Sequence, residues 1–286
     1  MQTLTALCCD VFVGFGFEYD AQTLRMVAVE VAEQTADLVR SIRDEAVAQG
    51  PVETKSTETD VVTTGDRAAE RLIRDRLATL RPGVPVLGEE EGGEAATDGL
   101  RWVVDPIDGT VNYLYGFPWY GVSIAAQVDG ESVAGAVVEP ASGRVWSAAR
   151  GHGAELDGRP LRISGADRVE MALIGTGFSY SVERRRTQAA AVARLLGEIR
   201  DIRRSGAASL DLCAVAAGWL DGYYEHGLQR WDWAAGALIA TEAGARLRLP
   251  GTGAGDGLGD DAILCTAPGI TEEFTAALKR SGAAGA

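Results

Sequence analysis

Apolar residues in the first part of the chain recur at helical spacing. From Asp20 they return every three or four positions until Gly50, where a Gly-Pro pair ends the pattern, and a second run covers residues 66–80 before Pro82. Each run predicts an amphipathic helix that turns one face to a core. Shorter apolar runs at residues 84–87 and 102–104 end in acidic residues, and they predict strands.

After Pro118 the pattern changes to β-rich runs separated by turn pairs. The runs "YGVSIAAQ", "SVAGAVVE" and "RVWSAA" are joined by segments containing "DG" and "SG", and another "DG" follows at residues 157–158. Such pairs between β-rich runs are typical of hairpins, and they predict an antiparallel sheet.

The second half of the chain alternates between strand and helix patterns. Strands are expected at residues 171–175, 201–204 and 221–225 and near Arg246 and Ile263, and helices at residues 183–198, 208–217, 231–243 and 271–279. Antiparallel hairpins followed by alternating elements predict an α/β protein of stacked helical and sheet layers.

The composition restricts the function more than the fold. The 286 residues are 46% hydrophobic and 24% charged, which is ordinary for a soluble globular protein of one or two domains. The formal net charge of −14 argues against non-specific binding to nucleic acid or to an anionic membrane, and no apolar run approaches the roughly 20 residues of a membrane span. An anionic substrate would need cations or helix N-termini at its binding site.

Cysteine and histidine are too few and too scattered for a zinc site. The chain has four cysteines and two histidines, at Cys8, Cys9, Cys213, Cys265, His152 and His226. No Cys-x-x-Cys pair occurs among them. Cys213 and Cys265 lie in apolar runs and are expected to be buried thiols. This usage favours a reducing compartment, and we expect a cytoplasmic protein.

Residues 1–19 precede the first helical run and fit none of the later patterns. They contain no Lys or Arg, and Asp10 interrupts their apolar stretch, whereas a secretory signal combines a basic segment with an unbroken apolar one. We expect an irregular leader here and a folded unit over residues 20–286.

Four acidic sites stand at the ends of the predicted elements. They are Asp66 in "TTGDRAAE", the pair Glu89-Glu90 in "LGEEEGG", the pair Asp105 and Asp108 in "WVVDPIDGTVN", and Asp232 in "RWDWAAG". Each alone is compatible with a helix N-cap or a solvated turn, and Asp66 and Asp232 both resemble N-caps.

Three features around Asp105 favour a metal site over a solvated turn. Pro106 fixes the backbone, so that Asp105 and Asp108 can converge while the Ile107 carbonyl joins them. Carboxylate and carbonyl oxygens are the ligands of hard cations such as Mg²⁺. The "DGT" at residues 108–110 suggests a strand-to-helix turn whose free N–H groups suit a phosphate. Together these features predict phosphoryl chemistry.

The motifs "GEEEG", "WVVDPIDGTVN" and "WDWAAGALIATEAGA", in this order and spacing, resemble the inositol monophosphatase family of metal-dependent phosphatases, and "KSTETDVVTTGDRAAE" and "DGYYEHG" fit the same pattern. The resemblance extends over residues 24–278. It implies an αβαβα layered sandwich with an antiparallel N-terminal sheet and a second mixed sheet. These would form one catalytic unit with subdomains at residues 20–165 and 166–286. It also implies a lithium-sensitive homodimer that acts on a small-molecule phosphate monoester. The net charge of −14, rather than the resemblance, argues against membrane and nucleic-acid partners.

By this resemblance two to three Mg²⁺ ions bind in the site. The first would be held by Glu89, Asp105 and the Ile107 carbonyl. The second would be held by Asp105, Asp108 and Asp232, so that Asp105 bridges the two ions.

The resemblance also implies a third ion and an activated water. Glu89 and, more weakly, Glu90 would hold the third ion. Asp66 and Thr110 would position and deprotonate the water, and Glu89 would also take part in catalysis. The expected activity is hydrolysis of myo-inositol 1-phosphate by direct in-line attack of that water.

The substrate contacts implied by the resemblance come from both halves of the chain. They are Asp108, Gly109, Thr110, Gly206, Ala207, Ala208, Glu225 and Asp232. The backbone amides of Gly109 and Thr110 would cradle the phosphate. Residues 206–208 would meet the alcohol portion, and Glu225 would accept hydrogen bonds from ring hydroxyls.

Two other functions stay open at this point. A sister phosphatase, acting on fructose 1,6-bisphosphate, histidinol phosphate or a 3′-phosphonucleotide, would share the metal ligands, although Glu225 and residues 206–208 favour a polyol ring. A regulator of transcription complexes would need a basic surface, for which "ERRRT" at residues 183–187 with Arg200, Arg203 and Arg204 is a candidate. A solvated helix face and strand end explains the same residues and agrees better with the overall charge.

Three further positions bear on metal binding, substrate or assembly. Glu91 stands where many relatives of the family have Ser or Thr, and Gln229 where some animal members have His. Metal affinity and local pH dependence are therefore expected to differ. Trp219 is compatible with a subunit interface but, as a tryptophan, is more commonly a core residue.

Overall fold

The computed structural model describes residues 19–49, 53–54, 61–93, 98–253 and 255–283. The expected leader lies outside these ranges apart from Tyr19. In chain order the elements are α1 (Ala21–Gln49), β1 (Glu53–Thr54), β2 (Val61–Val62), α2 (Thr64–Leu80), β3 (Val86–Gly88), β4 (Leu100–Asp108), α3 (Thr110–Tyr115), β5 (Gly121–Val128), β6 (Glu131–Val138), β7 (Val145–Ala149), β8 (Ala154–Leu156), β9 (Arg159–Pro160), η1 (Val169–Met171), β10 (Leu173–Thr176), α4 (Val182–Leu195), β11 (Asp201–Arg203), α5 (Ala208–Ala216), β12 (Gly222–His226), α6 (Arg230–Glu242), β13 (Arg246–Arg248), β14 (Ala262–Thr266), η2 (Pro268–Ile270) and α7 (Thr271–Ser281).

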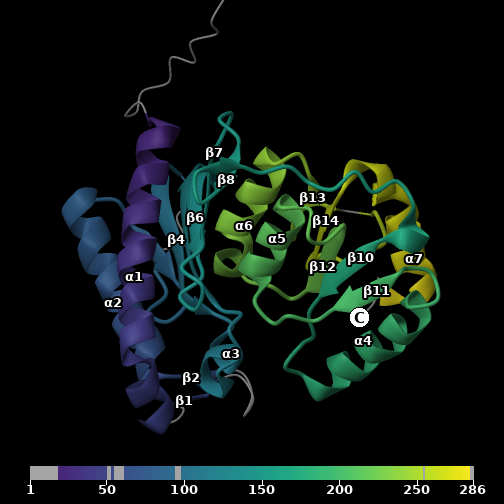
Figure 1. Cartoon of the computed structure of the whole chain (residues 1–286), viewed down its shortest axis with the longest axis horizontal. Helices are drawn as coiled ribbons and strands as arrows, with labels where there is room; N and C mark the ends of the chain where they lie inside the picture. The colour runs from purple at the N-terminus through teal and green to yellow at the C-terminus, as the bar shows by residue number, and fades with distance from the viewer. Residues whose placement is uncertain (1–18, 50–52, 55–60, 94–97, 254, 284–286) are drawn as a thin grey trace, which may run out of the picture.

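These elements form the five layers that the family resemblance implies. From left to right in Figure 1, α1 and α2 cover a seven-stranded sheet of order β3-β4-β5-β6-β7-β8-β9. Helices α5 and α6 separate it from a five-stranded sheet of order β11-β10-β12-β14-β13, and α4 and α7 cover the far face. The first sheet is antiparallel except for the parallel pair β3–β4, and the second is mixed. The αβαβα prediction is confirmed.

The layers are held together by strands that are apolar on both faces. On β4, Trp102 and Val104 pack toward α1 and α2, whereas Val103 packs toward α5 and α6. On β12, Tyr223 faces the central helices and Tyr224 faces α7. Because successive side chains of a strand point to opposite faces, one apolar run serves two cores. This explains why these runs are continuous rather than alternating.

The central helices approach each other most closely at Gly236 of α6. A Cβ at this position would lie 2.8 Å from the carbonyl oxygen of Ser209 and 2.9 Å from Cβ of Leu212, both on α5. No rotamer change can relieve the first contact, because the atom met belongs to the backbone. The glycine is therefore required by packing rather than by its own dihedral angles.

Gly236→Ala is expected to lower the free energy of unfolding by about 1–3 kcal/mol, since the overpacking outweighs the roughly 1 kcal/mol that alanine gains over glycine in a helix. Urea denaturation measures the difference. Gly165→Ala is the matched control, because no atom lies within 4 Å of its Cβ position, and it should change the free energy by less than about 0.5 kcal/mol. Equal stability of the two variants would contradict this account of the α5–α6 contact.

The prediction for the two buried cysteines is confirmed, whereas that for Trp219 is not. Cys213 and Cys265 are buried free thiols, as predicted, while Cys8 and Cys9 lie outside the described residues. Trp219 is 43% exposed, so the core assignment that tryptophan usually receives is wrong here. Its ring packs edge-on against Trp146, with a 5.1 Å separation of the ring centroids.

Within the described ranges, no helix combines the length and the apolar character that crossing a membrane requires.

Candidate functional site

Strand β4 carries Asp105 and Asp108 to the space between the two halves of the molecule. The strand is longer than the 102–104 run that predicts it, and both aspartates pair with β5, on either side of a register shift. Pro106 lies in the shift and has no N–H for the ladder, which is a usual cause of such an irregularity. The Asp105 carboxylate accepts a hydrogen bond from the Ile107 N–H at 3.0 Å, which fixes the bend.

Asp66 and Asp232 occupy equivalent positions in the first turns of α2 and α6. Neither is itself the N-cap, although both resemble N-caps in the sequence. The caps are Thr63 and Gln229, and each aspartate lies three residues further on and accepts the cap N–H, at 2.8 Å and 2.6 Å. A capping box places an acidic residue at this position, which is how the aspartates come to be held at the helix starts.

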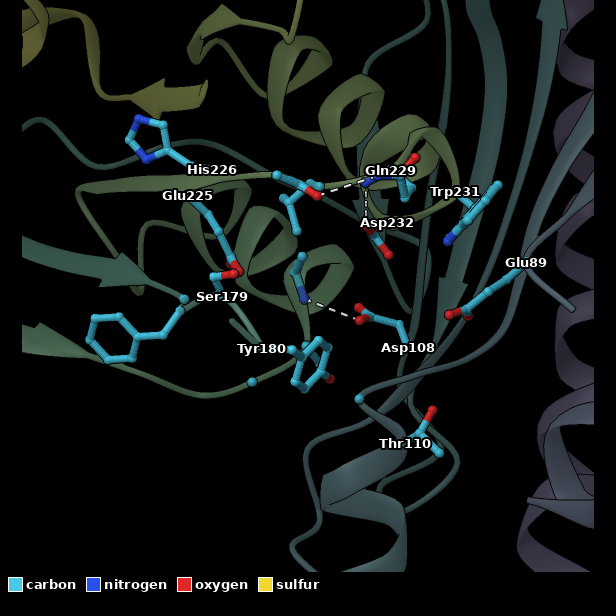
Figure 2. A pocket seen from close by; sticks show the side chains of 18 of the residues that line it. Glu89, Asp108, Thr110, Ser179, Tyr180, Glu225, His226, Gln229, Trp231 and Asp232 are labelled. Atoms are coloured by element: carbon cyan, nitrogen blue, oxygen red, sulfur yellow. Dashed lines mark hydrogen bonds between the residues drawn. The ribbon is translucent and has the colours of Figure 1, made fainter. Parts of the chain in front are cut away.

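The carboxylates of Glu89, Asp108 and Asp232 come from three separate parts of the chain and line one pocket of about 630 Å³. In Figure 2 the Glu89 and Asp232 side chains point toward Asp108. Asp105 is only 1% exposed and lies behind the pocket lining. The structure therefore brings together the four acidic residues that the resemblance assigns to metal binding.

Burial and mutual repulsion raise the pKa values of these carboxyls. The pKa of Asp108 is raised to about 7, chiefly by burial and also by the charge of Glu89. Burial, followed by the charges of Glu89 and Asp108, places the pKa of Asp105 and that of Asp232 well above the usual range. Such a group of carboxylates is unfavourable at neutral pH unless positive charge lies among them.

A hard divalent cation fits these donors by oxygen chemistry and by charge. As the side chains stand, no group of three or more His, Cys, Asp or Glu residues in the described ranges is arranged to hold an ion. Several oxygens are engaged by backbone donors instead. The Asp108 carboxylate accepts the N–H groups of Ala208 at 3.2 Å and Ser209 at 2.7 Å. These two N–H groups hold the Asp108 carboxylate at the start of α5.

Thr110 connects the pocket to the buried Asp66. Its hydroxyl lies 3.1 Å from the Asp66 carboxylate and 3.1 Å from the Ile107 carbonyl oxygen, so it can donate its one hydrogen to either. Asp66 is fully buried, and burial raises its pKa to about 6, against the lowering effect of its bonds with Thr63. A carboxylate of this pKa is a suitable proton acceptor near neutral pH.

Gly109 joins β4 to α3 in a left-handed conformation with φ of 90°. A Cβ here would lie 3.1 Å from the Gly206 carbonyl oxygen and 3.2 Å from Cβ of Ala207. The turn at residues 108–110 is thus packed directly against the start of α5, and residues 108–110 and 206–208 line the same pocket.

Glu225 lies on the opposite side of the pocket, beside Ser179 in Figure 2. It is on β12, and its carboxylate accepts a hydrogen bond from the Tyr223 hydroxyl two residues earlier on the same strand face. A Cβ at Gly177 would lie 2.0 Å from the Glu225 carboxylate, so this glycine leaves the space that the carboxylate occupies. Burial raises the pKa of Glu225, while the nearby charge of Arg204 opposes the increase.

The turn after β3 differs in detail from the sequence expectation. Glu89 lines the pocket, whereas Glu90 is not among the described residues that line it. The Glu91 carboxylate lies 3.4 Å from Nε of Arg74, so its extra negative charge is directed to α2. Gln229 lines the pocket and also begins α6.

Residues that the sequence reasoning missed support the site from behind. Glu70 binds the turn that carries Glu89, Ser209 binds Asp108, and Tyr223 binds Glu225. A signal was present for two of them: Glu70 follows Asp66 by one helical turn, and Tyr223 precedes Glu225 by one strand repeat. Neither spacing identifies the partner without the fold.

The basic surface that a regulator would use is partly neutralised. Arg184 lies 2.6 Å from the Asp261 carboxylate, and Arg203 lies 2.7 Å from that of Asp201. Arg184 and Arg204 also line the pocket. These pairings agree with a solvated surface and pocket rim.

The layered α/β fold and the carboxylates that line its pocket agree with the resemblance to metal-dependent phosphatases, and comparison with known proteins identifies the family. The model of the inositol monophosphatase family matches residues 20–283. The chain belongs to the inositol monophosphatase family.

Several relatives are similar over most of their length. An inositol-1-monophosphatase of Mycobacterium leprae is 53% identical over 91% of this chain and 95% of its own. The Nus factor SuhB of Pseudomonas aeruginosa is 40% identical over 78% of this chain and 84% of its own. Among solved structures, Mycobacterium tuberculosis SuhB has a TM-score of 0.79 and 47% identity, covering 93% of this chain and all of that one.

Proposed function

We propose that this protein is a Mg²⁺-dependent phosphomonoesterase that hydrolyses myo-inositol 1-phosphate to inositol and phosphate. The observation that carries the proposal is the meeting of Glu89, Asp105, Asp108 and Asp232 beside the Thr110–Asp66 hydrogen bond. Family membership and the inositol-1-monophosphatase relatives support the same activity.

In this proposal the metal ligands are those that the resemblance implies. Glu89, Asp105 and the Ile107 carbonyl would hold one Mg²⁺, and Asp105, Asp108 and Asp232 would hold a second. A third, weaker site would involve Glu89. When bound, Mg²⁺ supplies two things: it neutralises charge on the phosphate, and it makes a nearby water more acidic.

The chain itself moves the proton and places the phosphate. The Thr110 hydroxyl accepts a hydrogen bond from the attacking water and passes a proton toward Asp66, whose pKa near 6 leaves it mostly ionised at neutral pH. Backbone N–H groups at Gly109 and Thr110 face the phosphate at the start of α3. The water attacks phosphorus in line, the bond between phosphorus and the inositol oxygen breaks, and the leaving oxygen takes a proton from a second water, so that no covalent enzyme intermediate forms.

Glu225 is proposed to select the alcohol. A half-buried carboxylate at the far side of the pocket suits a ring with several hydroxyl donors, because each hydroxyl can donate to it. An aryl phosphate lacks such donors. Glu225 should therefore affect polyol phosphates far more than simple phosphate esters.

Glu225→Gln is expected to raise KM for inositol 1-phosphate about tenfold, the equivalent of about 1.4 kcal/mol for a weakened hydrogen bond to a charged group. KM for p-nitrophenyl phosphate should change by less than about twofold, because that substrate makes no such bond. Steady-state kinetics with both substrates measures the split. An equal increase in the two KM values would contradict a role in recognition of the alcohol.

A panel of substrates tests the proposed specificity. Phosphate release at saturating Mg²⁺ should be highest in kcat/KM for inositol 1-phosphate among inositol 1-phosphate, fructose 1,6-bisphosphate, histidinol phosphate and a 3′-phosphonucleotide. A preference for one of the other three would keep the reaction type and replace the substrate.

A further inference from the structure

The turn that carries Glu89 is held by a fully buried carboxylate from another element. Glu70 of α2 accepts hydrogen bonds from the N–H groups of Glu90 at 2.7 Å and Glu91 at 3.1 Å, the two amides that directly follow Glu89. Two successive backbone N–H groups around one carboxylate fix the orientation of the peptide planes between them. Glu70 therefore controls the direction in which the Glu89 side chain leaves the backbone.

Arg74, one turn further along α2, completes this support. Its guanidinium donates to Glu70 at 2.7 and 2.9 Å and to the carbonyl oxygens of Val86 at 3.2 Å and Gly92 at 2.6 Å. These carbonyls lie on either side of Glu89 along the chain. The planar guanidinium thus joins both ends of the turn to the carboxylate at its centre, a pattern that lysine cannot reproduce.

Close packing leaves this turn little freedom. The Gly88 N–H donates to the Gly92 carbonyl at 3.0 Å and closes the turn. A Cβ at Gly88 would lie 2.2 Å from the Glu70 carboxylate, so only glycine permits the contact. Glu91 adds to the support through its 3.4 Å contact with Arg74. The whole unit lies behind Glu89, and neither Glu70 nor Arg74 lines the pocket.

We propose that Glu70 and Arg74 are positioning residues that set the affinity of the site for its divalent cation by holding Glu89 toward Asp105 and Asp108. The inference rests on the proposed function, since it needs Glu89 to be a metal ligand. Groups that orient ligands from behind typically change metal affinity about 10- to 100-fold when they are removed. If Glu70 and Arg74 served only to stabilise the fold, their removal would lower the stability of the protein and leave its metal affinity unaltered.

The test compares Glu70→Gln with wild type by two measurements. Glutamine has the same shape, but it carries no charge for Arg74 and cannot accept both N–H groups through two carboxylate oxygens. The dissociation constant for Mn²⁺, measured from free Mn²⁺ by electron paramagnetic resonance, should rise about tenfold, as should the Mg²⁺ concentration for half-maximal activity. At saturating Mg²⁺, kcat should recover to within about twofold of wild type.

Glu30→Gln is the matched control, because Glu30 also pairs with an arginine of α2, Arg76 at 2.8 Å, but lies away from the turn. It should leave Mn²⁺ affinity unchanged. Arg74→Met provides a second test if Glu70→Gln folds poorly, since Arg74 is partly exposed, and it should weaken Mn²⁺ binding in the same direction.

The outcomes separate this inference from the function on which it rests. If wild type binds Mn²⁺ and both Glu70→Gln and Arg74→Met bind it equally well, the positioning role is wrong and the metal site stands. If kcat of Glu70→Gln stays low at saturating Mg²⁺ while Mn²⁺ affinity is normal, the residues are structural only. If wild type itself neither binds Mn²⁺ nor needs Mg²⁺, the proposed function fails first.

Discussion

Asp105→Asn is expected to reduce kcat for inositol 1-phosphate by at least about 10³-fold, which corresponds to about 4 kcal/mol of transition-state stabilisation. Asp105 is the residue proposed to contact both metal ions, so one substitution weakens two sites. Asparagine keeps an acceptor oxygen for the Ile107 N–H, which preserves the bend in β4. The Asp105→Asn variant therefore loses the negative charge of the side chain.

The fold should survive this substitution. Burial and the neighbouring carboxylates disfavour a charge on Asp105, so a neutral amide there relieves repulsion. We therefore expect the thermal midpoint without Mg²⁺ to be equal to or higher than that of wild type. Under the same conditions, added Mg²⁺ should stabilise wild type more than the variant, because a ligand that binds only the folded state raises its stability.

Glu139→Gln is the matched control for Asp105→Asn. Glu139 is also a buried carboxylate, but it accepts a hydrogen bond from Trp146 at 2.9 Å and pairs with Arg144 rather than lining the pocket. The Glu139→Gln substitution should lower the free energy of unfolding and leave kcat within about threefold of wild type. If Asp105→Asn retained near-normal kcat, Asp105 could not be a shared metal ligand.

Asp66→Asn should lower kcat by about 10²- to 10⁴-fold, the usual range for loss of a general base. Unlike Asp105, Asp66 is not a proposed metal ligand. The Mg²⁺ concentration for half-maximal activity should therefore stay within about twofold of wild type. This combination of a low kcat with an unchanged metal requirement distinguishes a proton acceptor from a ligand.

Thr110 supplies the companion variants for Asp66. Thr110→Val keeps the shape but removes the hydroxyl that lies 3.1 Å from Asp66, and it should lower kcat to a similar extent. Thr110→Ser keeps the hydroxyl and should recover most of the rate. A rate for Thr110→Val equal to that of Thr110→Ser would show that the proton does not travel through this hydroxyl.

The sequence predicts the periodic elements of this fold well, because their signals are local. The long helix after Asp20, the hairpins closed by "DG" and "SG", and the alternation after residue 170 all rest on neighbouring residues. The residues at which the helices begin are harder to predict. Thr63 and Gln229 are the N-caps of helices that the sequence predicts to begin near Asp66 and Trp231, since a capping box and an N-cap both place an acidic residue near a helix start.

The site is predictable only in part, because some of its residues come together only through tertiary packing. Asp105 and Asp108 are close in the chain, so Pro106 and the turn after them already indicate that they converge. Asp232 reaches the same pocket through the packing of α6 between two sheets, which no local pattern shows. Family resemblance supplied that link. The support of Glu89 by Glu70 became apparent only from the structure.

The most direct test of the proposed function is phosphate release from inositol 1-phosphate by the wild-type protein, measured in Mg²⁺, after removal of Mg²⁺ with EDTA, and after its return. We expect release in Mg²⁺, loss with EDTA, and recovery when Mg²⁺ is restored. Release that persists unchanged in EDTA, or its absence even at high Mg²⁺, would contradict it.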